Sequence, residues 1–348
     1  MKTIFIKSQQ RKYPVYIGKD ILNSTIDKIT KNNNFDQVVY LIDKTLKTPL
    51  KITDKIIRLS ISETDKNLKT AIRLIDKFIN LKLSKKSLVI NIGGGAFTDT
   101  ANFSETIYKR GINYINCPTT LLAMVDASIG GKNGVNYNKI KNIIGTINQP
   151  IAVIIDTNFL STLPKEQIIS GYAEIIKHSL IRDQNYFNQL RQKTLTIEQI
   201  IYRSVEIKKQ IIEQDEDETK GIRQLLNFGH TIGHSLEAYS HKINQPLLHG
   251  YAISLGIIAE AYISVKQKLL DQSSFQKIIE VLKDYQLPTK LNFKIDLPWI
   301  LDAIAKDKKS TAGKPRFVLL TKIGSAIGGQ SVETKIINES LKILCQKQ

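Results

Sequence analysis

Residues 87–99 read SLVINIGGGAFTD, an apolar run of strand length followed at once by three glycines and an acidic residue. Glycines at the carboxyl end of a strand let the backbone turn tightly and bring its N–H groups against a phosphate, with the positive end of the next helix alongside. The stretch lacks the GxGxxG pattern, so a plain tight turn is the alternative interpretation. The segment predicts a nucleotide-binding loop that contains Gly94, Gly95 and Asp99.

Strand-like and helix-like runs alternate on both sides of this segment. Periodicity predicts strands at residues 3–8, 13–18, 37–43, 113–118 and 152–156, and helices at residues 20–32 and 67–83. Farther along, residues 164–183, 196–217, 249–268 and 273–286 carry apolar residues at helical spacing. The predicted fold is an α/β, Rossmann-like nucleotide-binding domain over residues 1–157, followed by a mainly α-helical domain over residues 158–348.

The charge balance is strongly basic, with 50 Lys and Arg against 32 Asp and Glu in 348 residues, a formal net charge of +18. The lysines are scattered and no zinc finger, RNP motif or basic zipper is present, so we expect a small anionic substrate and no nucleic-acid partner. No run approaches the ~18 apolar residues that cross a bilayer. Two distant cysteines, Cys117 and Cys345, favour a reduced thiol state, so we expect a soluble, cytoplasmic protein without a membrane partner.

A second glycine-rich cluster follows the predicted strand at residues 113–118. It reads CPTTLLAMVDASIGGKNGVN over residues 117–136, with KNIIG a few residues later. So many glycines, hydroxyls and charges in under thirty residues are hard to assign to a core, so they are predicted to line a cofactor and substrate site. The side chains concerned are Thr119, Thr120, Asp126, Lys132 and Lys141.

Four of the five histidines fall within residues 230–249, and three of these, His230, His234 and His249, form the candidate group. His230 and His234 are four apart in RQLLNFGHTIGHSLEAYS and therefore share a helix face, and His249 follows in LLHGYA. This grouping predicts a metal site, and spacing alone names His230 and His234 as ligands. Glu174 could add a carboxylate, although its pairing with Lys177 three residues later is by itself typical of a surface ion pair.

Motifs between residues 93 and 309 together resemble the 3-dehydroquinate synthase family. They are GGGAFTD, YKRG, PTTLLAMVDASIGGKNGVN, KNIIG, LPKEQIISGYAEIIKH, QDEDETKGIRQLLNFGHTIGH, LLHG and DKK. The resemblance implies a metal-dependent sugar phosphate cyclase of the shikimate pathway, which keeps NAD bound and returns it unchanged. Its reaction converts 3-deoxy-D-arabino-heptulosonate 7-phosphate to 3-dehydroquinate and phosphate. Homodimerisation is expected by the same analogy.

The resemblance also implies the site residues. A divalent metal, zinc with cobalt as the alternative, would be held by Glu174, His230 and His249, so that His234 becomes a substrate or proton-relay residue. Substrate contacts would come from Asp126, Lys132, Asn142, Lys177, Lys209, Arg223, Asn227 and His234, with Arg110 and Lys308 or Lys309 on the phosphate or carboxylate. NAD would contact Asp43, Glu63, Lys66, Gly94, Gly95, Asp99, Thr119, Thr120, Lys132 and Lys141.

This chain departs from the usual family pattern at several positions. Thr98 and Asn102 stand where further glycines are usual, and Tyr251 stands where Glu usually follows HG. The nearest alternatives are a sibling cyclase acting on another sugar phosphate and an NAD-dependent polyol dehydrogenase, which would accumulate NADH. A non-catalytic binding protein or a nucleic-acid binder is the alternative of a different class.

Overall fold

The computed structural model describes residues 1–46, 52, 55–138, 140–306 and 315–345. Contacts group the chain into two units, of which the first comprises Met1–Pro164 with Ile197–Asp217 and the second Lys165–Thr196 with Glu218–Gln348. The segment 197–217 thus belongs to the first unit, whereas the sequence predicted it to be part of the helical domain over residues 158–348. As a statement about folding domains, the division at residue 157 stays a prediction.

The first unit is built on a largely parallel sheet. In the described part of the chain its seven strands run in the order β1-β2-β9-β6-β5-β3-β4, and only β1 is antiparallel to its neighbour. The strands are β1 (Lys2–Lys7), β2 (Lys12–Gly18), β3 (Val38–Asp43), β4 (Lys55–Leu59), β5 (Leu88–Gly93), β6 (Asn113–Pro118) and β9 (Ala152–Asp156).

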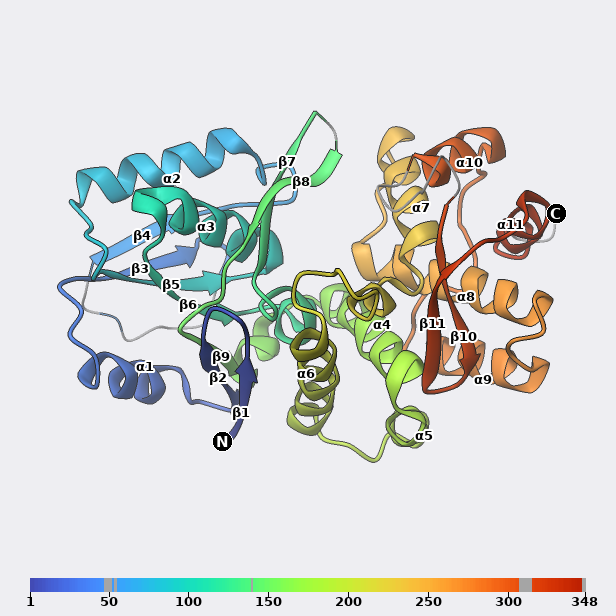
Figure 1. The fold of residues 1–348 in the computed structure, drawn as a ribbon, viewed down its shortest axis with the longest axis horizontal. Coiled ribbons are helices and arrows are strands. Elements are labelled where there is room, and N and C mark those ends of the chain that lie inside the picture. The colour runs from blue at the N-terminus through green and yellow to red at the C-terminus, as the bar shows by residue number, and fades with distance from the viewer. Residues whose placement is uncertain (47–51, 53–54, 139, 307–314, 346–348) are drawn as a thin grey trace. The chain divides into compact units, whose positions relative to one another are not determined.

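Helices cover both faces of this sheet. Helices α2 and α3 lie on one face and α1 on the other (Figure 1), and α6 packs on β1 and β2. Because both faces are covered, every residue of β5 is buried, as expected for a central parallel strand. The helices are α1 (Leu22–Lys31), α2 (Leu68–Asn80), α3 (Gly95–Ile107) and α6 (Ile197–Gln214), with the short turns η1 (Tyr108–Arg110), η2 (Ala123–Ala127) and η3 (Thr157–Thr162) and the hairpin β7 (Lys132–Tyr137) and β8 (Ile140–Ile147).

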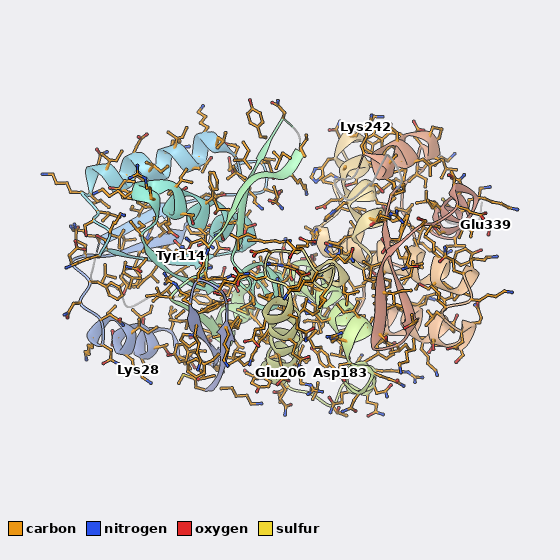
Figure 2. The ribbon with its side chains drawn as sticks, in the orientation of Figure 1. Lys28, Tyr114, Asp183, Glu206, Lys242 and Glu339 are labelled. Atoms are coloured by element: carbon orange, nitrogen blue, oxygen red, sulfur yellow. The ribbon has the colours of Figure 1, made fainter. Side chains whose placement is uncertain are left out.

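The apolar core of the first unit fills the layer between the sheet and α2 and α3. Val89 of β5, Phe78 of α2 and Phe97 of α3 belong to one buried cluster. Tyr114 lies inside this unit, whereas Lys28 extends from the surface of α1 (Figure 2). The spacing of the apolar residues in α2 and β5 therefore predicted these elements correctly.

A polar cluster is buried beside this core, where β5, α3 and β7 meet. Asn91 Nδ2 donates to Asn102 Oδ1 at 2.9 Å and to Glu105 Oε2 at 3.0 Å, and Asn102 Nδ2 donates to Asn133 Oδ1 at 3.0 Å. Glu105 is fully buried, and its burial raises the pKa of its carboxyl group well above the ordinary value. Asn102, which departs from the family pattern, is thus a structural link between α3 and β7.

The second unit is mainly helical and centres on α8. After its first turn, α8 is buried on almost all sides, because α4, α7, α9, α11 and β10 all pack on it. The elements are α4 (Lys165–Arg182), α5 (Gln184–Gln192), η4 (Arg223–Asn227), α7 (His230–Lys242), α8 (His249–Lys266), α9 (Gln272–Asp284), α10 (Leu297–Ala305), β10 (Phe317–Lys322), β11 (Ser325–Gln330) and α11 (Thr334–Lys342).

The predicted fold class, an α/β unit followed by a mainly helical one, is confirmed. The strand β4 and the hairpins β7–β8 and β10–β11 were not predicted. Among the described helices, none has the length and apolar character needed to cross a membrane.

Candidate active site

The carboxyl edge of the parallel sheet carries the predicted nucleotide loop. The neighbouring strands β3 and β5 end at Asp43 and Gly93. After β3 the chain passes to β4 on one side, and it returns through α2 to β5 on the other side, so the strand order reverses between β3 and β5. Ligands of open α/β sheets bind outside such a switch point. Asp43 and the glycine loop therefore flank the position where a nucleotide is expected.

The glycine loop packs against the residues that follow β6. Gly94 is the N-cap of α3 and Gly95 is its first residue. A β-carbon on Gly94 would lie 3.1 Å from Thr120 Cγ2, and the N–H of Thr119 donates to the Gly93 carbonyl at 3.0 Å. The structure thus brings together four of the predicted cofactor residues, Gly94, Gly95, Thr119 and Thr120.

An acid–base pair lies next to this loop. Lys66 Nζ is 2.6 Å from Asp99 Oδ2, and their side chains are only 4% and 17% exposed. Burial raises the pKa of Asp99, although the nearby Lys66 charge opposes this shift. Both residues were predicted to contact NAD, and their proximity gives α3 a fixed cation one turn from the glycine loop.

Two further predicted cofactor residues, Glu63 and Lys141, meet the predicted substrate residue Asn142 at the hairpin β7–β8. Glu63 Oε1 accepts from Asn136 Nδ2 at 3.0 Å and lies 4.0 Å from Lys141 Nζ. The N–H of Asn142 donates to Asn136 Oδ1 at 2.9 Å. Lys132 is exposed at the start of β7. The hairpin therefore gathers Glu63, Lys141 and Asn142 around one asparagine.

Asp126 pairs with Lys208, which was not among the predicted residues. Asp126 lies in η2, a π-helical turn, and its Oδ1 accepts from Lys208 Nζ at 2.5 Å, while Lys208 Nζ also donates to the Asp126 carbonyl at 2.6 Å. The predicted residue was Lys209, which is partly exposed one position along α6. Helical spacing could have separated the two, because Ile201, Val205 and Lys208 share the buried face of α6.

In the second unit, Glu174 and Lys177 form a buried ion pair. Both lie on α4 with side chains that are 0% and 1% exposed, and Lys177 Nζ contacts Glu174 Oε2. This burial excludes the interpretation of a surface pair. Taking a carboxylate and an ammonium out of water is costly unless they are well paired, so their retention inside the unit is typical of a functional site.

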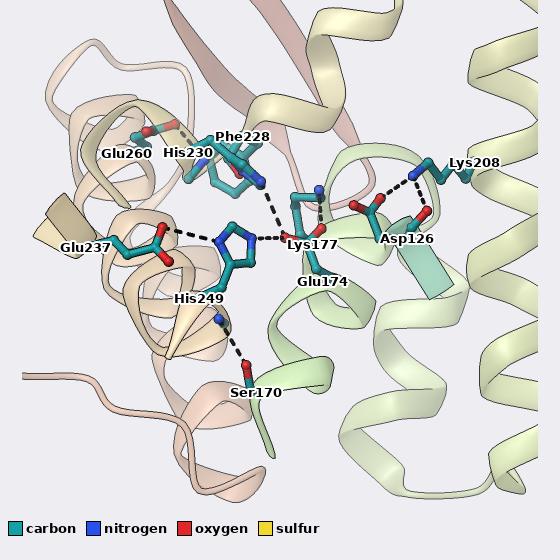
Figure 3. A network of polar contacts seen from close by, with 12 residues as sticks. Asp126, Ser170, Glu174, Lys177, Lys208, Phe228, His230, Glu237, His249 and Glu260 are labelled. Carbon is teal, nitrogen blue, oxygen red and sulfur yellow. Dashed lines mark hydrogen bonds and ion pairs between the residues drawn. The ribbon is translucent and has the colours of Figure 1, made fainter. Parts of the chain in front are cut away.

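Two imidazoles converge on the other oxygen of Glu174 (Figure 3). His230 Nε2 lies 3.4 Å and His249 Nε2 lies 3.6 Å from Glu174 Oε1. His234 is also adjacent, with ring centroids 5.0 Å from His230 and 5.8 Å from His249. The structure therefore brings together the pair that spacing names, His230 and His234, and the set that the resemblance implies, Glu174, His230 and His249.

Hydrogen bonds to the second ring nitrogens orient two of these imidazoles. His230 Nδ1–H donates to the Phe228 carbonyl at 3.1 Å, and His249 Nδ1–H donates to Glu237 Oε2 at 3.4 Å. Each bond leaves Nε2 turned toward Glu174, an arrangement common among metal-bound histidines. Glu237 was not predicted, although it lies three residues after His234.

The two imidazoles differ in basicity. Burial, aided by the Lys177 charge, lowers the pKa of His230 well below its ordinary value, so this ring is neutral. Burial also disfavours the charged form of His249, but hydrogen bonds to Glu174 and Glu237 outweigh it and raise its pKa to about 10. A metal ion at His249 would therefore take the place of a proton.

The donor set fits a divalent metal ion such as zinc. Two ligands that are each about 2.1 Å from a tetrahedral ion lie about 3.4 Å apart. The distances of 3.4 and 3.6 Å from Glu174 Oε1 to the two Nε2 atoms match this spacing. One carboxylate and two imidazoles leave coordination positions open, which is typical of a catalytic site.

Three further predicted residues lie in short helical turns, Arg223 and Asn227 in η4 and Arg110 in η1. Arg223 is buried in η4 beside α4, and Asn227 Nδ2 donates to Glu218 Oε1 at 3.4 Å. Arg110 lies beyond the far end of α3, about 20 Å along that helix from the glycine loop. Lys308 and Lys309 lie outside the described residues. These assignments stay predictions.

Family models match most of the chain. The model for the N-terminal part of 3-dehydroquinate synthase matches residues 56–170, and the model for its C-terminal part matches residues 171–310. The 3-dehydroquinate synthase of Pelagibacter ubique is 39% identical over 97% of this chain and 97% of its own length. The family resemblance of the sequence is confirmed.

Solved structures of two other cyclases share the fold. One is 2-deoxy-scyllo-inosose synthase complexed with carbaglucose-6-phosphate, NAD⁺ and Co²⁺, which covers 98% of this chain and 99% of its own with a TM-score of 0.85. The other is 2-epi-5-epi-valiolone synthase from Streptomyces hygroscopicus with NAD⁺ and Zn²⁺ bound, which covers 97% and 98% with a TM-score of 0.85. Both are 24% identical to this chain.

Proposed function

The chain belongs to the 3-dehydroquinate synthase family, and from this premise we propose that it converts 3-deoxy-D-arabino-heptulosonate 7-phosphate into 3-dehydroquinate and inorganic phosphate. The observation that carries the proposal is the buried Glu174 carboxylate with the Nε2 atoms of His230 and His249 at 3.4 and 3.6 Å. These three ligands would hold a divalent cation and leave coordination positions open for substrate oxygens.

The proposal includes NAD and one divalent cation, zinc with cobalt as the alternative. Cyclases of the same fold carry NAD⁺ with Co²⁺ or Zn²⁺. Glu174, His230 and His249 would hold the cation, and the loop at Gly94 and Gly95 would hold the NAD pyrophosphate. The cation supplies charge stabilisation for a substrate alkoxide, and NAD accepts a hydride and returns it.

The chain's own residues would bind and orient a substrate that carries a phosphate and a carboxylate. Lys177 is held in place by Glu174, and Lys208 is held in place by Asp126. Ammonium groups fixed in this way can donate hydrogen bonds to phosphate oxygens or exchange protons without a further entropic cost of ordering the side chain. We therefore propose Lys208 in place of Lys209 as a substrate residue, whereas Asp126, Lys177 and His234 remain the candidates for proton transfer. The net charge of +18 favours an anionic substrate.

A sibling cyclase that acts on another sugar phosphate is the second candidate. The two solved cyclases favour it, because they share the fold with a TM-score of 0.85 and bear names of other products. The identity of 39% to a 3-dehydroquinate synthase, against 24% to either of those cyclases, favours the first candidate.

One incubation separates these candidates. The protein is supplied with the seven-carbon phosphate, zinc and NAD below the substrate concentration, and phosphate release is measured beside carbocycle formation. Equal amounts of phosphate and carbocycle, without growth of absorbance at 340 nm, are expected. Net NADH would instead indicate a polyol dehydrogenase, and turnover only with a different sugar phosphate would indicate a sibling cyclase.

The ligand set is tested by His249→Ala, which should lose both bound zinc and turnover. His241→Ala is the matched control, because His241 is an exposed histidine in the last turn of α7. Full zinc content and full rate in His249→Ala would refute the ligand assignment.

The proposal has three further parts: a homodimer, a cytoplasmic location and the domain division at residue 157. Sedimentation, cell fractionation and limited proteolysis, respectively, would test them.

A further inference from the structure

A second buried carboxylate lies behind the imidazoles, on the helix that begins with His249. Glu260 is fully buried in α8. Its Oε2 accepts the N–H of Gly229 at 2.7 Å, and its Oε1 accepts the N–H of Ile232 at 3.1 Å (Figure 3). One side chain thus holds both ends of the short stretch 229–232, which contains His230.

The start of α7 depends on a cap from outside. The first N–H groups of a helix have no partner within it, and an N-cap side chain usually accepts from them. Here the N-cap is Gly229, with a φ of 79° and no side chain. A β-carbon there would lie 2.8 Å from Ile257 Cγ1 and 3.0 Å from the Ile257 nitrogen. Because α8 approaches so closely, α7 cannot use a capping residue of its own, and Glu260 of α8 supplies the acceptor.

The same stretch determines where the His230 ring points. His230 lies between the two N–H groups that Glu260 holds, and its Nδ1–H donates to the carbonyl of Phe228, which immediately precedes Gly229. If the turn relaxes, the carbonyl and the Cα of His230 both move. The direction of Nε2 toward Glu174 Oε1 at 3.4 Å would change with them.

Near Glu260, helix α8 is itself anchored to strand β10 through Ser264. Ser264 Oγ donates to the Glu260 carbonyl at 2.8 Å and accepts the N–H of Leu320 from β10 at 3.0 Å. Glu260 and His249 are eleven residues apart, about three helical turns, and therefore lie on one face of α8. The helix that contributes His249 thus also holds the turn that contributes His230.

We propose that Glu260 is a positioning residue, which fixes the turn at residues 229–232 so that His230 Nε2 is presented to a divalent cation. The inference rests on the proposed function, because it assigns His230 to that cation. Groups that orient metal ligands commonly change metal affinity about 10- to 100-fold when they are removed. Glu260 would act in this way through the backbone.

The test uses Glu260→Gln and Glu260→Ala, with Co²⁺ alone as the probe. Gln keeps the shape of the side chain but has one carbonyl oxygen, so it can accept from only one of the two N–H groups; Ala accepts from neither. Each metal-free protein is titrated with Co²⁺ at a temperature where it is folded, and the dissociation constant and the visible spectrum are recorded. Thermal unfolding is measured separately.

Co²⁺ affinity should fall about 10-fold in Glu260→Gln and up to about 100-fold in Glu260→Ala, with altered visible bands in both. Glu105→Gln is the matched control, because Glu105 is a fully buried carboxylate in the first unit, and it should bind Co²⁺ as the wild type does. If the Glu260 variants lose thermal stability but keep affinity and spectrum, the inference is overturned. If the wild type itself binds no Co²⁺, it is the proposed function that fails.

Discussion

The contact between the first turn of α8 and the backbone of α4 provides a sharp test of how His249 is placed. A β-carbon on Gly250 would lie 1.9 Å from the Ser170 carbonyl oxygen and 2.6 Å from its carbon. Atoms in ordinary contact are about 3.5 Å apart, so Gly250→Ala requires α8 and α4 to separate by roughly 1.5 Å at this point. The neighbouring residue on α8 is His249, and Glu174 is one turn along α4 from Ser170.

A separation of roughly 1.5 Å would displace His249 relative to Glu174 by more than the ~1 Å misplacement that impairs a catalytic site. Overpacking of this kind costs about 1–3 kcal/mol of unfolding free energy. A misplacement near 1 Å reduces turnover about 100-fold. Gly250→Ala should therefore lower the free energy of unfolding by about 2 kcal/mol, zinc affinity by at least about 10-fold and turnover by about 100-fold.

The assays are chemical denaturation, zinc competition with a chelator, and phosphate release. Ser170→Ala is the matched control: it removes the hydroxyl that accepts the Gly250 N–H at 3.0 Å but leaves the backbone spacing unchanged. Its cost should be about 1 kcal/mol, with near-normal zinc affinity. If folded Gly250→Ala binds zinc and turns over like the wild type, the close contact between α8 and α4 does not place His249.

Three further predictions concern the first unit. The folded state keeps Glu105 protonated above its ordinary pKa of 4.5, so the folded wild type holds one more proton than the unfolded chain and loses stability as the pH rises. Relative to the wild type, the unfolding free energy of Glu105→Gln should therefore rise by about 1.4 kcal/mol per pH unit between pH 4.5 and the folded-state pKa. Parallel curves of stability against pH for the two proteins would contradict this. Lys208→Met should lower the rate of phosphate release about 100-fold while Lys209→Met changes it little, and equal effects would refute the role of the Asp126 pair. Lys66→Met should lower the unfolding free energy by about 3 kcal/mol, because it leaves Asp99 buried without its cation. In denaturation curves, adding Asp99→Asn should restore part of this loss. If the effects of the two substitutions simply add, the two side chains are not coupled.

Local periodicity predicted the elements that are buried on a regular face. The strand at residues 88–93 and the helix at residues 68–80 follow from apolar spacing, because burial on both faces or on one stripe imposes that spacing. The strand at residues 55–59 has only exposed and partly buried residues at the sheet edge, so it carries no such pattern. The second strand of the hairpin β7–β8 likewise contains only exposed and partly buried residues.

The glycine loop, the basic charge and the presence of three close histidines were determined by the sequence alone. Which imidazoles meet a carboxylate was decided by tertiary packing, because His249 reaches Glu174 only through the contact of α8 with α4. Spacing along one helix pairs His230 with His234 and carries no information about a residue on another helix. The choice of Lys208 over Lys209, and the capping of α7 by Glu260, depend in the same way on which face of a helix its neighbour covers.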